Sequence, residues 1–218
     1  TLTMDGDDNL FALWRSSPTS NPDWDAPAVL VGAQRRADGS WLPATTLVNN
    51  AAVYDVDRDG DGRLHVVVPT GASTYVLHQS GAGWSAPEAV PGAVFSRYAK
   101  IVAGPGGRLD VFILSTNTYL HVYHYRRAAN GAWSPATDLG AFGIGFQLLE
   151  VDGTVHFFAP NDDGKLVRRR LWPAGTWTAV ETLPIKAPSD FAVVADAAGR
   201  LHFAWLSSSF DGQLHYRL

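Results

Sequence analysis

A repeat of about 46 residues is the sequence feature that most constrains how this chain of 218 residues can fold. Its first marker is a leucine or valine that opens an apolar run. This marker occurs at Leu10, Leu64, Leu109, Val155 and Leu201, at intervals of 54, 45, 46 and 46 residues. A second marker, a tryptophan that follows a small residue, occurs at Trp41, Trp84, Trp133 and Trp177. Two independent markers with one period indicate five copies of a single supersecondary unit.

The sequence pattern of each unit predicts four antiparallel strands. The first is a short mixed run, expected at 52–56, 99–103, 147–151 and 191–195, and a Gly/Asp turn follows it. The second strand is apolar on both alternating faces, which predicts burial on both sides. A further turn, often Asp-Gly, favours a tight hairpin and leads into an amphipathic third strand. The fourth strand begins at the tryptophan. Its prolines indicate an edge strand of the sheet, because proline has no backbone N–H to donate to a neighbouring strand.

Four-stranded units at this period predict an all-β fold, a five-bladed β-propeller with antiparallel blades of four strands each. We expect a single domain over 1–218. Its blades are predicted at 1–48, 49–92, 93–140, 141–185 and 186–218. The last blade is incomplete, because the sequence reaches Leu218 without a fourth-strand tryptophan. A blade of three strands, a truncated chain, or a strand supplied by a second copy or a partner chain would each explain this.

Composition argues against several classes of protein. The 17 basic and 21 acidic residues give a net charge of −4, which is unlike a general nucleic-acid binder. No apolar run approaches the roughly 20 residues that span a bilayer, so no membrane span is expected. The absence of cysteine is neutral on compartment. Because the sequence begins at Thr1, we expect that a leader or flanking domain was removed, and that the protein is secreted or extracellular. A cytoplasmic location is the alternative.

One stretch has carboxylates at alternate positions that run into glycines. Its acidic residues are Asp55, Asp57, Asp59 and Asp61. Ca²⁺ takes six to eight oxygen ligands, and alternate carboxylates can curl around it. The acidic residues that close known calcium loops are absent, since Arg63 and Val66 stand in their places. The stretch therefore predicts either a calcium site or a solvated acidic turn between two strands.

Histidines occupy equivalent positions of the repeat, directly after the apolar marker, at His65, His156 and His202. Three histidines could hold a metal ion. Equivalent positions lie in different blades, however, and the second strand of a blade packs between its neighbours. We therefore expect structural histidines that hydrogen-bond to the backbone of neighbouring blades.

Aromatic residues give the strongest indication of a ligand. They recur where neighbouring blades should meet, and one tryptophan lies in a long polar insertion at 16–25. Sugars lay their C–H faces on aromatic rings while polar groups bind their hydroxyls, and repeated weak pockets give avidity. We therefore predict ligand contacts at Trp24, Trp41, Trp84, Trp133, Trp177 and Tyr125. The alternative is that the tryptophans pack the blades together, a role that large aromatic side chains fill well.

The run 108–140 resembles the repeat of the Photorhabdus-type β-propeller lectins. The matching parts are Arg-Leu-Asp-Val-Phe at 108–112, Tyr-Leu-His at 119–121, Gly-Ala-Trp-Ser at 131–134 and Leu-Gly at 139–140. The run is also similar to the BNR-type repeats of sialidase-like propellers, although their Ser-x-Asp-x-Gly-x-Thr-Trp box is absent. The resemblance covers most of the chain and implies a propeller with sugar pockets between blades. Those lectins have seven blades, whereas the repeat here predicts five.

Three functions fit this fold. The first is a non-catalytic, lectin-like propeller with repeated shallow pockets, whose partners are glycans or another small polar ligand. The second is an enzyme, such as a glycoside hydrolase, a lyase or a small-molecule cyclase, with one site at the mouth of the axis. The third is an assembly module whose open fifth blade pairs with another strand. Aromatic residues repeat, and so do the arginines at 35–36, 126–127 and 168–170. Because no complete catalytic set is visible beside them, the sequence favours binding.

Overall fold

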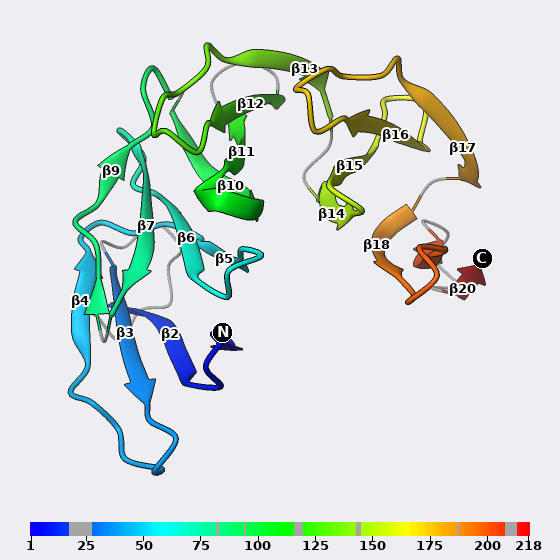
Figure 1. Cartoon of the computed structure of the whole chain (residues 1–218). Coiled ribbons are helices and arrows are strands. Elements are labelled where there is room, and N and C mark those ends of the chain that lie inside the picture. The colour runs from blue at the N-terminus through cyan, green and yellow to red at the C-terminus, as the bar shows by residue number, and fades with distance from the viewer. Residues whose placement is uncertain are drawn as a thin grey trace. The chain divides into compact units, whose positions relative to one another are not determined.

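The computed structural model describes residues 1–17, 28–81, 83–93, 95–115, 120–142, 145–186, 188–207 and 213–218. These residues form antiparallel β-sheets and no α-helix (Figure 1), which confirms the predicted fold class. None of the described segments is a helix long and apolar enough to cross a membrane. The chain groups into two compact units, Thr1–Leu139 and Gly140–Leu218. The single domain over 1–218 stays a prediction.

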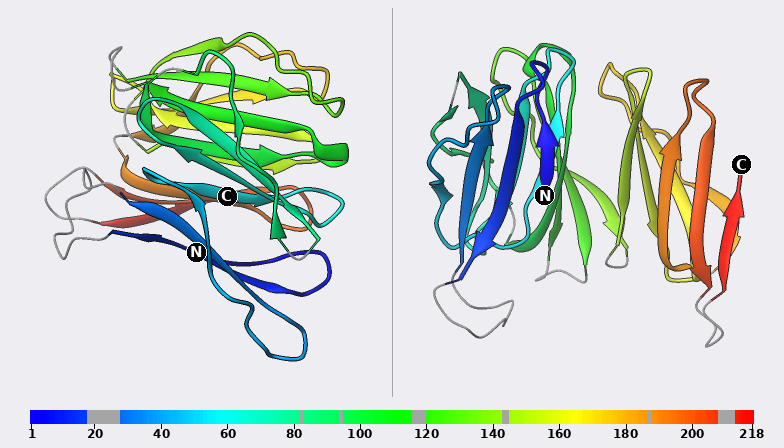
Figure 2. Two further views of the ribbon diagram at one scale, coloured as in Figure 1. Left: turned by 90° about the vertical axis from the view of Figure 1, so that its left-hand side faces the viewer. Right: turned by 90° about the horizontal axis from the view of Figure 1, so that it is seen from below.

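The first unit contains three sheets in its described residues, and Figure 2 shows their strands from two further sides. The first sheet consists of β1 (Leu2–Met4), β2 (Leu10–Ser16), β3 (Val29–Arg35) and β4 (Thr45–Val48). The second consists of β5 (Asp55–Arg58), β6 (Leu64–Pro69) and β7 (Thr74–Ser80), with β8 (Gly83–Trp84) and β9 (Glu88–Ala89) both paired to β7. The third consists of β10 (Ser96–Ala103), β11 (Leu109–Ser115), β12 (His121–Arg127) and β13 (Thr137–Ala141). A 3₁₀ turn, η1 (Pro105–Gly107), connects β10 to β11.

The second unit contains two sheets in the part that the structure describes. The fourth sheet consists of β14 (Gln147–Val151), β15 (Thr154–Pro160), β16 (Lys165–Leu171) and β17 (Glu181–Lys186). The fifth consists of β18 (Pro188–Ala195), β19 (Leu201–Ser207) and β20 (Leu214–Arg217). Over the described ranges 188–207 and 213–218 this last sheet has three strands, as the repeat predicts.

The second strands carry the core of the first unit. Every residue of β6 and of β11 is buried, which agrees with their apolar character on both faces. Val67 of β6 and Val111 and Ile113 of β11 belong to one apolar cluster. The second and third sheets therefore pack against each other, and the hydrophobic effect stabilises that contact.

The fourth strands begin later than the sequence predicts. Three of the marker tryptophans form isolated bridges outside the strands, and Trp84 lies in the two-residue β8. Regular pairing starts four residues after each tryptophan, at Thr45, Glu88, Thr137 and Glu181. In the first three sheets a proline lies in this gap and cannot donate to the ladder. The fourth sheet has the same gap without a proline.

The first strands follow the prediction unevenly. In the fourth sheet, β14 has the predicted bounds, 147–151. In the second sheet, the first strand is β5 at 55–58 rather than 52–56, so that prediction is wrong by three residues at its start. Asp55 and Asp57 therefore lie on a strand and not in a turn. At alternate positions of a strand, their side chains share one face of the sheet.

Candidate functional site

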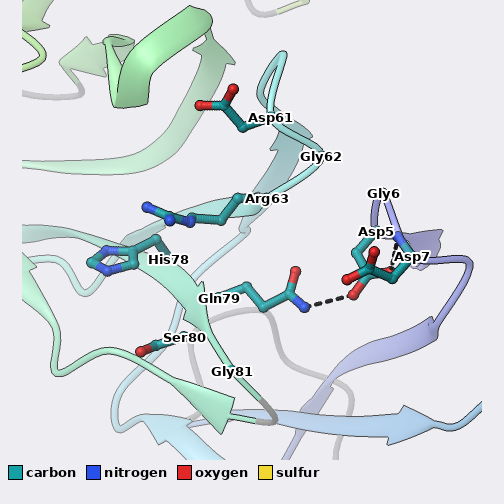
Figure 3. Close-up of a pocket in the computed structure, with 10 residues that line it drawn as sticks. All are labelled: Asp5, Gly6, Asp7, Asp61, Gly62, Arg63, His78, Gln79, Ser80 and Gly81. Carbon is teal, nitrogen blue, oxygen red and sulfur yellow. Dashed lines mark hydrogen bonds between the residues drawn. The ribbon is translucent and has the colours of Figure 1, made fainter.

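A polar pocket lies between the hairpin turns of the first two sheets (Figure 3), and we call it the hairpin pocket. Its volume is about 380 Å³. It is lined by Asp5, Gly6, Asp7, Asp61, Gly62, Arg63, His78, Gln79, Ser80 and Gly81. These residues come from the turn between β1 and β2, the turn between β5 and β6, and the end of β7 with the turn that follows it. Three separate segments of the first unit thus form its wall.

Two aspartates fix the turns on which the pocket is built. The Oδ1 atom of Asp5 accepts the backbone N–H groups two and four residues later, at 3.0 and 2.9 Å. Asp59 does the same in the second turn, also at 3.0 and 2.9 Å. Aspartate favours such turns because its short carboxylate reaches backbone N–H groups just ahead of it. Both turns are therefore held in one conformation by their own sequence.

The two turns touch at a pair of glycines. The N–H of Gly6 donates to the carbonyl oxygen of Gly62 at 2.8 Å. A Cβ atom at position 62 would lie 2.5 Å from the Cα of Gly6, and Gly62 has a φ of +84°. Glycine alone among the amino acids suits both the close approach and the left-handed backbone.

Gln79 connects the third strand of the second sheet to the turn of the first. Its Nε2 atom donates to Oδ2 of Asp5 at 2.6 Å. Burial by itself would raise the pKa of Asp5, but hydrogen bonds from Gln79 and Asn9 hold that pKa below its usual 3.8. The Asp5 carboxylate is therefore ionised and already paired at neutral pH.

Other polar groups of the hairpin pocket are available to a ligand. In the described part of the chain, the side chains of Asp7, Asp61 and Arg63 have no hydrogen-bond or ion-pair partner. Burial, together with the nearby cationic groups, lowers the pKa of His78 below its usual 6.5, so its imidazole is neutral at pH 7. In Figure 3, Arg63 and His78 lie on one side of the pocket, and Asp7 lies on the other.

A second candidate site lies where the second and third sheets meet, and we call it the Glu88 junction. The Oε1 atom of Glu88 accepts hydrogen bonds from Nε1 of Trp133 at 2.7 Å and from Nε of Arg127 at 3.0 Å. All three side chains are partly exposed. Burial by itself would raise the pKa of Glu88, but the bonds from Arg127 and Trp133 hold it below its usual 4.5. A carboxylate, a guanidinium and an indole thus stand together at the surface of the first unit.

The corresponding junction between the first and second sheets has different chemistry. Trp84 packs edge-on against Phe11, with ring centroids 5.8 Å apart. Thr45 stands where the repeat places Glu88 in the next sheet. Thr45 and Trp84 line a pocket of about 270 Å³ with mostly apolar walls. The buried Oε1 atom of Gln34, another lining residue, has no hydrogen-bond partner among the described residues. The repeat therefore supplies the tryptophan at both junctions but not the same polar groups.

The remaining predicted ligand residues lie in different surroundings. Tyr125 is 1% exposed and donates its hydroxyl to Gly92 at 3.2 Å, so its ring belongs to the core and offers no face to a ligand. Trp41 is 50% exposed. In the second unit, the guanidinium carbon of Arg169 lies 5.3 Å from the ring centre of Trp177. Trp24 lies outside the described residues.

The first two acidic residues of the predicted calcium stretch bind neighbouring backbone. Oδ2 of Asp55 accepts the N–H of Ile101 at 3.0 Å, and Oδ2 of Asp57 accepts that of Ala103 at 2.8 Å. Both N–H groups belong to β10 of the next sheet. Burial raises the pKa of both carboxyl groups above 3.8. These side chains therefore hold two sheets together.

The other two acidic residues point elsewhere. The second oxygen of Asp59 lies 2.8 Å from Nε2 of His65, and Asp61 lines the hairpin pocket. Among the described residues, no group of three or more histidine, aspartate or glutamate side chains is arranged to hold a metal ion. Calcium at Asp55, Asp57, Asp59 and Asp61 stays a prediction.

Sequence reasoning missed most of the hairpin pocket, including Asp7, Arg63 and His78. One signal was present: the tripeptide Asp-Gly-Asp occurs at 5–7 and again at 59–61, at the same interval of 54 residues that separates the first two apolar markers. Equivalent turns rich in acid and glycine in neighbouring blades should meet at one end of the sheets. The signal points to the two turns but not to His78, which comes from a different strand.

Comparison with known proteins gives matches to solved structures but none to families or curated sequences. No family model and no curated protein matches the sequence. Among solved structures, the BP39L lectin from Burkholderia pseudomallei has a TM-score of 0.66 at 16% identity, over 98% of this chain and 67% of that one. A protein of unknown function from Dyadobacter fermentans DSM 18053 has a TM-score of 0.63 at 12% identity, over 100% and 77%. Virginiamycin B lyase from Staphylococcus aureus has a TM-score of 0.55 at 15% identity, over 95% and 74%.

The sheets and these similarities define the chain as a β-propeller protein whose blades are antiparallel sheets. At identities of 16% or less, the similarity establishes the fold and not the function. Its neighbours include both a lectin and a lyase, so the fold by itself does not select between binding and catalysis. The choice depends on the sites.

Proposed function

We propose that this chain is a carbohydrate-binding β-propeller protein that holds a sugar at the Glu88 junction. The arrangement of Glu88, Arg127 and Trp133 carries the proposal. The resemblance of its repeat to Photorhabdus-type lectins and the lectin among its structural neighbours support the same function.

The three side chains match the three kinds of surface that a sugar presents. The Oε2 atom of Glu88 has no partner among the described residues and can accept a hydroxyl proton. The terminal nitrogens of Arg127 can donate to a neighbouring hydroxyl oxygen. The partly exposed ring of Trp133 can receive the apolar C–H face of the sugar ring. Because Glu88 already holds the other two groups, little ordering is required when the sugar binds.

A glycan array, followed by titration calorimetry with the best glycan, tests the proposal. Glu88→Gln should weaken binding about tenfold, because a hydrogen bond to a charged group is replaced by one to a neutral amide. Glu181→Gln is the matched control: Glu181 also lies four residues after its marker tryptophan, but it pairs with Arg168 at 2.7 Å in the second unit. Binding to no glycan on the array would contradict the proposal, as would equal losses in both variants.

Catalysis on the same scaffold is the alternative, and turnover of a bound glycan would favour it. Secretion and a partner strand on the fifth sheet also stay proposals from the sequence. For calcium, the melting temperature measured with and without EDTA is the test: a fall on chelation supports a bound ion, and an unchanged value opposes it.

A further inference from the structure

We propose that the hairpin pocket binds a small hydroxylated ligand that carries a protonated amine, such as an amino sugar. The proposal concerns a second site with its own chemistry, which does not depend on the Glu88 junction. It rests on the size of the cavity, the unpaired groups that line it and the sign of their charge.

The size and polarity of the hairpin pocket suit a small polar molecule. Its volume of about 380 Å³ lies at the lower end of the roughly 300–1,000 Å³ that is usual for small-molecule sites. Such sites are mostly apolar, whereas seven of the ten lining residues here have polar or charged side chains and the other three are glycines. A hydroxylated ligand can replace the water in such a pocket without leaving polar groups unpaired.

The charge of the lining selects a cation. Asp5, Asp7 and Asp61 supply three carboxylates, whereas Arg63 supplies the one full positive charge among the lining residues. His78 adds none at pH 7, because its pKa is lowered. The lining is therefore net negative, which attracts a protonated amine and disfavours an anionic ligand.

The positions of these groups divide the pocket into two parts. Asp7 lies on one side in Figure 3, and its carboxylate has no partner, so it can accept from an ammonium group. Arg63 and His78 lie on the other side. They can bind hydroxyl oxygens, while the exposed hydroxyl of Ser80 can both donate and accept. A ligand that presents an amine to the first side and hydroxyls to the second matches this division.

The pocket is also held in shape before any ligand binds. The contact between Gly6 and Gly62 and the bond between Gln79 and Asp5 join its three wall segments. The free carboxylates of Asp7 and Asp61 belong to turns that are themselves fixed by Asp5 and Asp59. A preorganised wall lowers the ordering cost of binding.

Titration calorimetry with three disaccharides of the same skeleton tests the proposal: chitobiose with both amines free, its N,N′-diacetyl form, and cellobiose. We expect the free amine to bind, more weakly as salt is added because the attraction is between charges, and the other two to show none of this salt-dependent binding. Equal binding of all three, or failure of the free amine to bind, would overturn the proposal.

Variants locate the binding. Asp7→Asn and Asp61→Asn should each weaken binding of the amine disaccharide about fivefold, as expected for one partly exposed ion pair. Asp162→Asn, at an exposed turn of the second unit, removes the same charge and should change nothing. Unchanged binding in both pocket variants would place the ligand elsewhere. Glu88→Gln should leave this binding intact, so the two proposed sites can fail separately.

Discussion

Two hairpin turns, 59–63 in the second sheet and 196–200 in the fifth, use the same residues for the same hydrogen bonds. Asp59 accepts the backbone N–H groups two and four residues later, and its other oxygen meets Nε2 of His65 at 2.8 Å. Asp196 repeats all three contacts, with His202 at 3.2 Å. The predicted repeat thus extends to individual hydrogen bonds.

The two turns differ in burial. The side chains of His65 and Asp59 are 4% and 1% exposed, whereas those of His202 and Asp196 are 26% and 23% exposed. Burial lowers the pKa of His65 although Asp59 opposes this, so the ring stays neutral and donates to the carboxylate. The sequence repeats the constellation, but neighbouring segments decide how much each copy contributes to stability.

The largest effect is expected from Asp59→Ala. The substitution leaves buried donors at His65 and in the turn without an acceptor, which should cost about 3 kcal/mol of unfolding free energy. Asp196→Ala removes equivalent bonds where water can replace the carboxylate, so its effect should be much smaller. Urea denaturation of both variants measures the difference. Equal losses would show that burial does not separate the two turns.

Gly62→Ala should have the next largest effect. A left-handed φ and a Cβ only 2.5 Å from backbone together predict a loss of about 2 kcal/mol. Gly199 is its counterpart in the fifth sheet, with a φ of +73° and its nearest neighbour, Cγ1 of Val151, 3.5 Å from a Cβ. Gly199→Ala should therefore cost only the backbone strain, about 1 kcal/mol. Thermal unfolding compares the two, and a larger loss at Gly199 would contradict the expected order.

His156 holds the same repeat position in the fourth sheet but has cationic neighbours instead of an aspartate. Burial, then Arg168 and Arg170, lower its pKa from 6.5 to about 4. The unfolded chain therefore takes up the proton first, and stability is lost as pH falls from 6.5 toward 4. Allowing for partial exposure, this amounts to roughly 1.5 kcal/mol. Urea denaturation at pH 7 and pH 4.5 should show this loss in the parent protein and a smaller one in His156→Phe.

The smallest effect concerns Asp196 itself. The backbone N–H of Arg200 and the ring of His202 lower the pKa of its carboxyl to about 2. Because this value lies below the unfolded 3.8, the stabilisation is present above pH 4 and is lost as the pH falls toward 2. Carboxyl-carbon NMR should give a midpoint near 2 for Asp196. His202→Phe should shift this midpoint only modestly toward 3.8, since the backbone hydrogen bond from Arg200 remains. A midpoint near 3.8 in the parent protein would contradict the proposed cause of the lowered pKa.

Much of the fold could be predicted because local patterns determine it. The second strands were predicted to be buried because their side chains are apolar on both faces, and the structure confirms this for β6 and β11. The bounds of β14 were also predicted correctly from its own residues. The first strand of the second sheet was predicted at 52–56 but lies at 55–58, where the N–H groups of β10 bind Asp55 and Asp57 and hold them in a strand. That contact spans 46 residues of sequence, so no local pattern reports it.

The candidate sites were less predictable for the same reason. Four of the predicted aromatic positions were chosen by repetition, yet Trp84 packs on Phe11 and Trp133 binds Glu88. Tyr125 was also predicted to contact a ligand but is buried. The partners of Trp84 and Trp133 come from the preceding sheet and differ from each other, whereas Trp177 has Arg169 of its own sheet beside it.

The sequence by itself determined the period, the order of the strands and the turns that join them, because hydrophobic alternation and turn chemistry act between residues close in the chain. The tertiary structure decided which carboxylates are buried, which tryptophans meet a polar partner, and where unpaired groups surround a cavity. Burial and electrostatic contact depend on residues some 40 to 75 positions apart, such as Asp5 and Gln79, and only packing of one sheet on the next brings them together.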